Sequence, residues 1–510
     1  MLISTFPNKI LYKIQDEINR LLIEKENFIT QLFRSEKYFP AIIFFLALIS
    51  RLIPVLLTSN LGIGLDDMFQ YDMLARSIES GNGYRWYAQE DFYLAQQYID
   101  FDMSLVDYDP RGVLTSFRPP LYPAFLALVY FIFGVGSQRF FVTRIIQSLM
   151  GAALAPLTYL IAKSVIPLKS KWSRAAAWIV AFYPMLVIYP LSLATENLFF
   201  LLIIGSLWLL LLAEKNRKWH LFAIAGILLG LTCLTRSVAM LFACLVVCWV
   251  WFSLKEKKFA LIIILLVSIV TLPWMLRNTF LHHKLTGIES ALGYDLYVGY
   301  HPDGTGTFQY GISLDLIPYL DDGLRDKIGQ DQAIEFIKTN PERIPYLIIR
   351  KFGYFWGLER RALTYFYSNN YFGPIPNIIL MFISFVFLTP FVLVSLSAAI
   401  GFALTKWDRT NILLGLLLGG YLLPHVFILA EDRFHLTLIP ILAIAAVTAW
   451  GSGWSLIKNR WRTRNGKVAL SIAIIISVLL MANWTLELFR DREMINLLLG
   501  VNGNTTYFPY

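Results

Sequence analysis

Long apolar segments recur along this chain, and they constrain its fold more than any other feature. Stretches of roughly 17–25 predominantly apolar residues recur between residues 38 and 488, and each can cross about 30 Å of hydrocarbon as an α-helix. Charged residues make up 15% of the 510-residue chain, whereas about 25% is usual for a soluble protein. The sequence therefore predicts an all-α polytopic membrane protein.

Clusters of Lys and Arg between the apolar segments predict the topology. The net charge of +9 lies largely in these clusters, so it indicates membrane orientation and not a nucleic-acid partner. The basic clusters are at 163–174, 215–218, 255–258, 406–409 and 458–467. Placing all of them in the cytoplasm predicts spans at 38–58, 139–162, 174–191, 193–213, 219–235, 237–254, 259–276, 375–404, 410–430, 436–456 and 468–488. We expect about 11–13 transmembrane helices in total.

One apolar segment, residues 119–135, does not fit this alternation. If it crossed the membrane, the basic cluster at 163–174 would move to the outside unless another crossing compensated. A re-entrant or surface-lying helix is the preferred interpretation, and a crossing helix stays open.

The predicted topology divides the chain into five parts. Residues 1–37 are expected to form a cytoplasmic amphipathic basic helix rather than a signal peptide. Residues 38–276 form an N-terminal transmembrane module that includes a first outer loop, 59–118. A second large outer loop, 277–374, precedes the C-terminal transmembrane helices, 375–488, and a tail, 489–510. Loops of this length are usually functional.

Several ionisable residues are predicted at the outer ends of spans. An ionisable group close to hydrocarbon is costly and is a candidate functional residue, although any one of them can instead be an interfacial anchor. These residues are Arg118, Glu196, Arg236, Arg277, Glu431, Asp432 and Arg433. Their position on one predicted face favours a shared site.

Two adjacent carboxylates, Asp66 and Asp67, open a helical pattern in "GLDDMFQYDMLARSI". Free N–H groups and the helix dipole at a helix N-terminus favour an ionised carboxylate. An acidic N-cap without further function explains this pair equally well when it is considered alone. Facing arginines, however, an ionised carboxylate can act as a general base while the arginines bind a phosphate.

The order of several motifs resembles the GT-C class of membrane glycosyltransferases. The similarity is to bacterial relatives of protein O-mannosyltransferases (dolichyl-phosphate-mannose-protein mannosyltransferase-like) and of lipid A aminoarabinose transferases. The motifs are "DMFQYDMLA", "RPPLYP", "ATENLFF", "GILLGLTCLTR", "PWMLRN", "NPERIPYLIIRKFGYFW" and "EDRFHLTLIPIL", spread over roughly residues 40–450.

The resemblance implies a GT-C fold and an inverting transfer of sugar from a polyprenyl-phosphate donor. The acceptor would be a lipid, a glycan or a protein, at the outer face of the inner (plasma) membrane. Asp67 corresponds to the catalytic aspartate of the family, and Arg118 and Arg236 correspond to residues that contact donor phosphate. Membrane lipids are expected partners, and nucleic acid is not.

This chain departs from the family at two positions close to Asp67. Many relatives have Asp-Glu where this chain has Asp67-Met68, so Asp66 is expected either to replace the missing acid or to share the catalytic role. Aminoarabinose transferases have a basic residue where this chain has Gln70, so Arg433 or Arg277 is expected to supply a phosphate contact. The expected residues that shape the site are Tyr71, Glu196 and Glu431.

No metal or other cofactor is expected. Some GT-C relatives use a divalent cation, for which Asp66, Asp67 and Glu196 offer oxygen ligands, but the closer relatives are not expected to need one. The histidines lack zinc-binding spacing and are expected in packing or interfacial roles. Cys233, Cys244 and Cys248 are expected to be small buried residues.

Two further interpretations of the sequence stay open. A transporter or flippase for lipid-linked sugars would also explain charged residues at span ends, although transporters usually bind near the bilayer midplane. The second is an inactive GT-C scaffold, which the presence of Asp66 and Asp67 disfavours. The aromatic and acidic residues of the first loop suit either a substrate pocket or a solvated lid.

Overall fold

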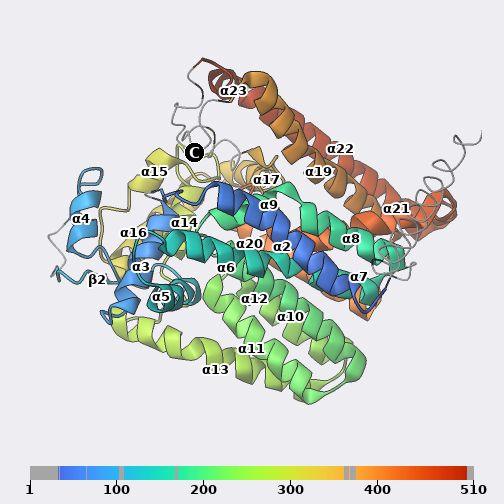
Figure 1. Cartoon of the computed structure of the whole chain (residues 1–510), viewed down its shortest axis with the longest axis horizontal. Coiled ribbons are helices and arrows are strands. Elements are labelled where there is room, and N and C mark those ends of the chain that lie inside the picture. The colour runs from blue at the N-terminus through green and yellow to red at the C-terminus, as the bar shows by residue number, and fades with distance from the viewer. Residues whose placement is uncertain are drawn as a thin grey trace, which may run out of the picture.

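Apolar helices account for most of the chain in this computed structural model (Figure 1). The structure describes residues 35–501, apart from 65, 103–107, 167–169, 361–366 and 368–374, together with Phe33 and Gly503. The amphipathic helix expected within residues 1–37 lies almost wholly outside the described residues.

Each expected span coincides with a helix or with consecutive helices. They are α2 (Phe39–Leu57), α6 (Arg139–Ala152) with α7 (Leu154–Val165), α8 (Ser170–Phe182) with α9 (Pro184–Ile188) and η1 (Tyr189–Leu191), α10 (Glu196–Asn216), α11 (Trp219–Thr235), α12 (Ala239–Cys248) with the π-helix η2 (Trp249–Ser253), α13 (Lys257–His282), α19 (Asn377–Leu404), α20 (Arg409–Phe427), η3 (Phe434–Leu438) with α21 (Ile439–Trp461), and α22 (Arg464–Arg490).

Length and hydropathy support a multi-pass membrane protein. Within the described residues, eight helical segments are long and apolar enough to span a bilayer, or nine if α8 and the following α9–η1, bent by 52°, count as one span. Three apolar helices are shorter: α5 (Leu121–Phe133), α11 and the segment Ala239–Ser253. Large apolar side chains such as Phe280, Phe382 and Leu479 are exposed, as expected where lipid surrounds a protein. The prediction of an all-α polytopic membrane protein is confirmed.

Helix α5 accounts for the segment that did not fit the predicted topology. Its 13 residues span only about 20 Å, less than the thickness of a hydrocarbon core. Pro119 and Pro120 precede it, and Gly134 at φ 86° ends it in a conformation that favours glycine. The α5 helix alone is therefore too short to cross.

The two predicted outer loops contain most of the remaining secondary structure. The first loop holds α3 (Asp67–Glu79), α4 (Gln89–Ala95) and a ribbon of β1 (Arg85–Trp86) and β2 (Val113–Leu114), paired antiparallel with Trp86 opposite Val113. The second holds α14 (Leu292–Gly299), α15 (Tyr310–Leu314), α16 (Asp322–Thr339) and α17 (Arg343–Phe355). A short helix, α23 (Arg492–Leu498), follows α22.

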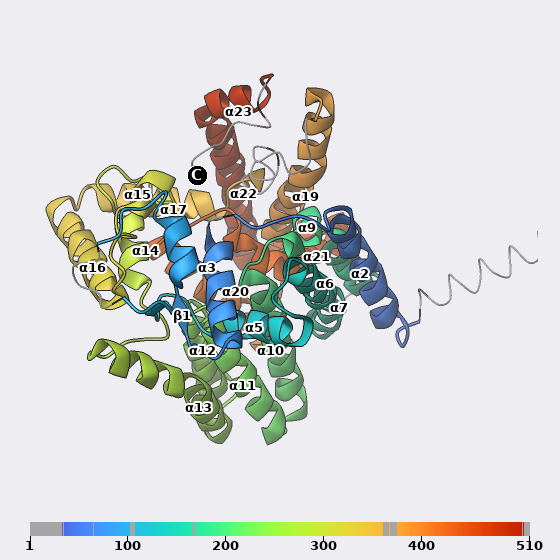
Figure 2. The same cartoon turned by 60° about the vertical axis from the view of Figure 1, so that its left-hand side comes forward.

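The two loops share a hydrophobic core, and α3, α4 and α14–α16 lie together at one end of the molecule (left in Figure 1). Helices α14–α16 are also on the left in Figure 2. Trp86, Phe92 and Phe117 of the first loop are buried in this core with Tyr294 and Leu316 of the second loop. The aromatic residues of the first loop thus include core residues that join the two loops.

The cysteine prediction is confirmed for one residue and wrong for two. Cys233 is buried, but Cys244 and Cys248 are exposed. Their spacing of four places them on the same side of α12, on an outward face where an apolar side chain would meet lipid.

Candidate active site

The N-terminus of α3 presents the acidic pair. The Asp66 carboxylate accepts a hydrogen bond from the Met68 N–H at 2.9 Å and so caps the helix, while Asp67 is its first residue. Further along α3, the buried Asp72 carboxylate accepts hydrogen bonds from the Tyr130 hydroxyl at 2.9 Å and the Arg139 Nε at 2.8 Å. Asp72 therefore fixes α3 against α5 and α6.

Asp67 lies between two arginines from distant parts of the chain. One carboxylate oxygen is paired with the Arg118 guanidinium, and the other lies 3.4 Å from Arg433. Arg118 also donates to the Gln70 side chain at 2.9 Å, and its guanidinium lies 5.5 Å from the centre of the Tyr71 ring. The structure thus brings Asp67, Arg118, Arg433 and Tyr71 together.

A second ion pair adjoins this cluster. The Arg236 guanidinium lies 2.5 Å from the Glu196 carboxylate, at the N-terminus of α10, and 4.9 Å from the centre of the Phe434 ring. Arg433, next to Phe434, is held by Glu431 at 3.0 Å. Three arginines predicted to bind phosphate are therefore gathered in one region, and carboxylates hold each of them.

Protein surrounds this region, yet solvent reaches it. The side chains of Asp67, Arg118 and Arg433 keep 36%, 20% and 35% of their exposure, while the surrounding protein acts on each pKa against the charged form. These three side chains are therefore partly enclosed by protein and still reached by solvent.

The two adjacent aspartates differ in their titration. Burial raises the pKa of Asp67, but Arg118 and Arg433 outweigh this effect and hold its pKa below the usual value. The surrounding protein atoms, and then the neighbouring Asp67, raise the pKa of Asp66 to about 6, although its side chain is exposed to solvent on one side. Carboxylate partners raise the pKa of Arg118 and Arg433 despite burial. At neutral pH, Asp67 is therefore an ionised carboxylate between two charged guanidinium groups.

Arg277 does not join the cluster. Its guanidinium donates to the Thr115 carbonyl at 2.6 Å and lies 4.8 Å from the centre of the Trp274 ring. Arg277 also donates to the Asn278 side chain at 3.0 Å, and none of these partners is Asp67.

Two carboxylates of the second loop were missed by the sequence reasoning. The Glu289 carboxylate accepts a hydrogen bond from the Ser237 hydroxyl, next to Arg236. Burial, followed by the charges of Glu289 and Asp67, raises the pKa of Asp295 to about 7, while Arg118 opposes this shift. Their proximity depends on packing of the second loop onto α3, for which neither residue carries a local sequence signal.

Within the described residues, no group of three or more His, Cys, Asp or Glu side chains is arranged to hold a metal ion. Asp66, Asp67 and Glu196, the set considered above as potential ligands, do not form such a group. The oxygens of Asp67 and Glu196 face guanidinium groups instead.

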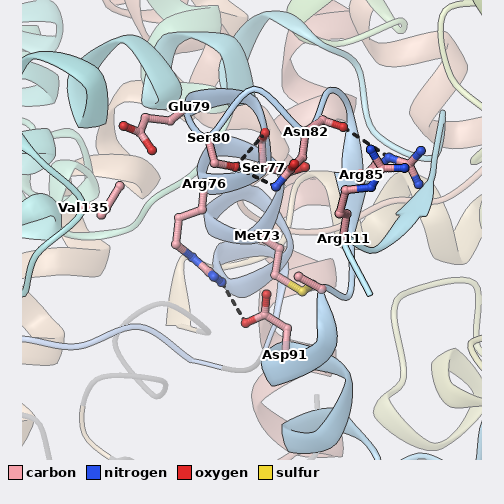
Figure 3. A pocket seen from close by; sticks show the side chains of 11 residues that line it. Met73, Arg76, Ser77, Glu79, Ser80, Asn82, Arg85, Asp91, Arg111 and Val135 are labelled. Carbon is pink, nitrogen blue, oxygen red and sulfur yellow. Dashed lines mark hydrogen bonds and ion pairs between the residues drawn. The ribbon is translucent and has the colours of Figure 1, made fainter. Parts of the chain in front are cut away.

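A separate cavity of about 230 Å³ lies on the first loop, lined by residues that include Arg76, Arg85, Asp91 and Arg111 (Figure 3). Arg76 is paired with Asp72 and Asp91, each at 2.8 Å, and Arg111 is paired with Asp109 at 2.6 Å. The predicted site residues do not line this cavity. It is therefore distinct from the cluster around Asp67.

Comparison with known proteins supports the family assignment in part of the chain. Residues 117–276 match the model of the family described as dolichyl-phosphate-mannose-protein mannosyltransferase. The matched segment contains Arg118, Glu196 and Arg236. No curated protein matches the chain closely enough to count as a relative.

Solved structures with a similar arrangement have low sequence identity. An oligosaccharyltransferase from Archaeoglobus fulgidus, tethered to an acceptor peptide, is 15% identical, with a TM-score of 0.47 over 94% of this chain and 61% of that chain. The A. fulgidus enzyme AglB with an inhibitory peptide and dolichol phosphate is 13% identical, with a TM-score of 0.46 over 94% and 61%. ArnT from Cupriavidus metallidurans, bound to undecaprenyl phosphate, is 12% identical, with a TM-score of 0.36 over 84% and 80%.

This chain spans about three fifths of the length of the archaeal oligosaccharyltransferase chains that it matches. Those likenesses are too distant to decide the chemistry of this chain. The family match covers residues 117–276. It confirms the predicted resemblance: over residues 117–276 this chain is similar to the dolichyl-phosphate-mannose-protein mannosyltransferases, a family of the GT-C class.

Proposed function

We propose that this chain is an integral-membrane glycosyltransferase that uses a polyprenyl-phosphate-linked sugar as donor. An acceptor hydroxyl or amine of a lipid, glycan or protein would attack the anomeric carbon and invert it. The bond from that carbon to the phosphate oxygen breaks, and its electron pair leaves with the polyprenyl phosphate. The observation that carries this proposal is the partly exposed Asp67 carboxylate held between Arg118 and Arg433.

Asp67 is the proposed general base. It would take the proton of the acceptor as the new bond forms, for which it must be ionised and within hydrogen-bond reach of the acceptor. Its lowered pKa provides the ionised form at neutral pH. Asp66 supports this role by adding negative charge beside Asp67 once it is itself ionised.

Arg118, Arg433 and Arg236 are the proposed ligands of the donor phosphate. As the sugar leaves, the phosphate gains one negative charge, which guanidinium groups stabilise through charge-assisted hydrogen bonds. Glu196 and Glu431 would orient Arg236 and Arg433, because each carboxylate is within 3.0 Å of its arginine. Tyr71 supports Arg118 through its ring face.

Donor binding would also activate the base. Arg118 and Arg433 both face Asp67, and both would have to share their charge with an entering phosphate. Weaker pairing with Asp67 moves its pKa back towards the ordinary value, which makes the carboxylate a stronger base. The base would therefore be strongest when the donor is in place.

Arg277 is proposed to support the site indirectly, through the backbone of the segment that precedes Arg118. Its bond to the Thr115 carbonyl lies three residues before Arg118, so it supports that segment rather than the phosphate itself.

The proposed location is the inner (plasma) membrane, with the site at its outer face. The basic clusters between spans support this orientation through the positive-inside rule. Both large loops that contribute site residues would then lie outside the cytoplasm.

A transfer assay tests the proposal. The purified full chain in nanodiscs is incubated with a radiolabelled polyprenyl-phosphate sugar and a cell-envelope extract as acceptor. We expect label to move from the lipid to an acceptor at a rate that depends on enzyme concentration. Movement of intact labelled lipid across vesicle membranes without transfer would contradict the proposal and favour a transporter.

A further inference from the structure

The segment that carries Arg118 is held by one buried carboxylate of the second loop. Oδ2 of Asp322 accepts hydrogen bonds from the Thr115 hydroxyl at 2.5 Å and from the Ser116 N–H at 2.6 Å. The Asp322 side chain is fully enclosed, with 0% of its surface exposed. Hydrogen bonds in such an enclosed setting are stronger than exposed ones.

Other contacts fix the same segment from different sides. The Ser116 hydroxyl lies 2.6 Å from the His282 Nε2 and 2.8 Å from the Ser290 hydroxyl. The Ser290 N–H donates to the Ser116 carbonyl at 3.0 Å, and Arg277 donates to the Thr115 carbonyl at 2.6 Å. Segment 115–118 is therefore fixed through both backbone and side-chain atoms.

Asp322 is itself held rigidly at the start of α16. Asp321 caps this helix by accepting from the Leu324 N–H at 3.0 Å, which sets the position of the first turn. The Arg325 guanidinium, one turn on, lies 3.9 Å from Asp322 and 4.9 Å from the centre of the Phe117 ring. The first turn of α16 thus contacts three consecutive residues, Thr115 to Phe117, immediately before Arg118.

We propose that Asp322 is a positioning residue that holds Arg118 in place for the donor phosphate. The inference rests on the proposed function, because it requires Arg118 to bind phosphate. Arg118 follows Ser116 by two residues, so a displaced segment would carry the guanidinium away from both Asp67 and the phosphate. A displacement of about 1 Å is enough to lower the efficiency of a preorganised site strongly.

Three substitutions separate the hydrogen bonds of Asp322 from its charge. Asp322→Ala removes both bonds. Thr115→Val removes one of them, together with the acceptor of the Phe117 N–H at 3.0 Å, with almost no change of shape. Both bonds go to a single oxygen, which the amide oxygen of Asp322→Asn can replace.

Binding of undecaprenyl phosphate to the full chain is measured by native mass spectrometry. We expect Asp322→Asn to bind this lipid nearly as tightly as wild type does. Thr115→Val should bind more weakly, and Asp322→Ala about tenfold more weakly. Asp331→Asn, an exposed carboxylate change on the same helix, is the matched control.

A double-mutant cycle with Arg118→Ala tests whether Asp322 acts through Arg118. Arg118→Ala should weaken binding, and adding Asp322→Ala should then weaken it no further. An equal loss from Asp322→Ala with and without Arg118 would overturn the inference while leaving the proposed phosphate role of Arg118 intact. Unchanged binding by Arg118→Ala alone would instead contradict that role and the inference with it. If Asp322→Ala does not fold, Thr115→Val takes its place in the cycle, and wild-type affinity of that variant would overturn the inference.

Discussion

At the scale of single residues, the proposed chemistry depends on two adjacent aspartates with different environments. Asp67 faces two guanidinium groups, so its pKa is lowered, whereas Asp66 caps α3 and lies beside the negative charge of Asp67, so its pKa is raised to about 6. Neighbouring carboxylates with separated pKa values can take different roles in one reaction.

This difference predicts the pH dependence of transfer. Asp66 is protonated below about pH 6 and ionised above it, so its support of the base appears as the pH rises through this value. We expect kcat/KM of the wild type to increase between about pH 5 and 7 and the Asp66→Asn variant to lack this step. Asp295→Asn is the control, because the pKa of Asp295 is raised to about 7. A step that persists in Asp66→Asn and disappears in Asp295→Asn would assign it to the second loop.

The residue scale also shows what the sequence could predict of the site. Two features could be recognised from the local sequence: a pair of acids at a helix N-terminus, and arginines at the ends of spans. The structure brings Asp67, Arg118 and Arg433 from these features together. Arg277 has the same local pattern as Arg236, but the direction of each guanidinium depends on neighbouring helices and loops. Asp322 was missed because its contact with Thr115 joins residues more than 200 positions apart.

At the scale of elements, the short turn that carries Arg433 is anchored in the core. His435 of η3 places Nδ1 2.7 Å from the Phe355 carbonyl and Nε2 3.0 Å from the Glu359 carboxylate, which also accepts from the Tyr183 hydroxyl at 2.5 Å. The ring stacks on Phe391 at 4.1 Å. The expected packing role of this histidine is therefore confirmed, together with a polar contact that the sequence did not predict.

Removing Glu359 should destabilise this element. Glu359→Ala removes the acceptor of the Tyr183 hydroxyl and the hydrogen-bond partner of His435 Nε2 in a buried region, at a cost of about 2–4 kcal/mol. We expect a lower thermal unfolding temperature in detergent and weaker binding of undecaprenyl phosphate, because Arg433 lies two residues from His435. Glu335→Ala, an exposed change on α16, should leave both unchanged. Wild-type stability of Glu359→Ala would show that the anchor lies elsewhere.

The sequence predicted where the helices lie better than it predicted their lengths and bends. Runs of apolar residues located the spans, because the number of consecutive apolar residues determines whether a helix is long enough to cross the hydrocarbon core. The 52° bend between α8 and α9 and the short α5 were not predicted as such. Pro184 lies at the start of α9, and Pro119 and Pro120 precede α5. A proline alone, however, does not determine how its neighbours pack.

At the scale of the whole molecule, the candidate site lies where the two large loops meet the ends of the spans. Asp67 and Arg118 come from the first loop, Arg236 follows α11, and Arg433 lies between α20 and α21. The shared aromatic core of the two loops gives this arrangement its rigidity.

The proposed orientation predicts which surfaces a membrane-impermeant thiol reagent can reach. In a variant lacking Cys233, Cys244 and Cys248, a cysteine replacing the exposed Glu90 of the first loop should react in intact cells. A cysteine replacing the exposed Lys406, in a basic cluster, should react only after the membrane is permeabilised. The reverse pattern would place the site on the cytoplasmic side.

The central claim is that Asp67 is the base of a sugar transfer, and one comparison tests it most directly. Transfer from a polyprenyl-phosphate sugar and binding of undecaprenyl phosphate are measured side by side for wild type, Asp67→Asn and the exposed-acid control Glu90→Gln. We expect Asp67→Asn to lower the transfer rate by about 10²–10⁴-fold. Its lipid-phosphate binding should be as tight as that of wild type or tighter, because Arg118 and Arg433 no longer pair with a carboxylate. Wild-type transfer by folded Asp67→Asn would contradict the account.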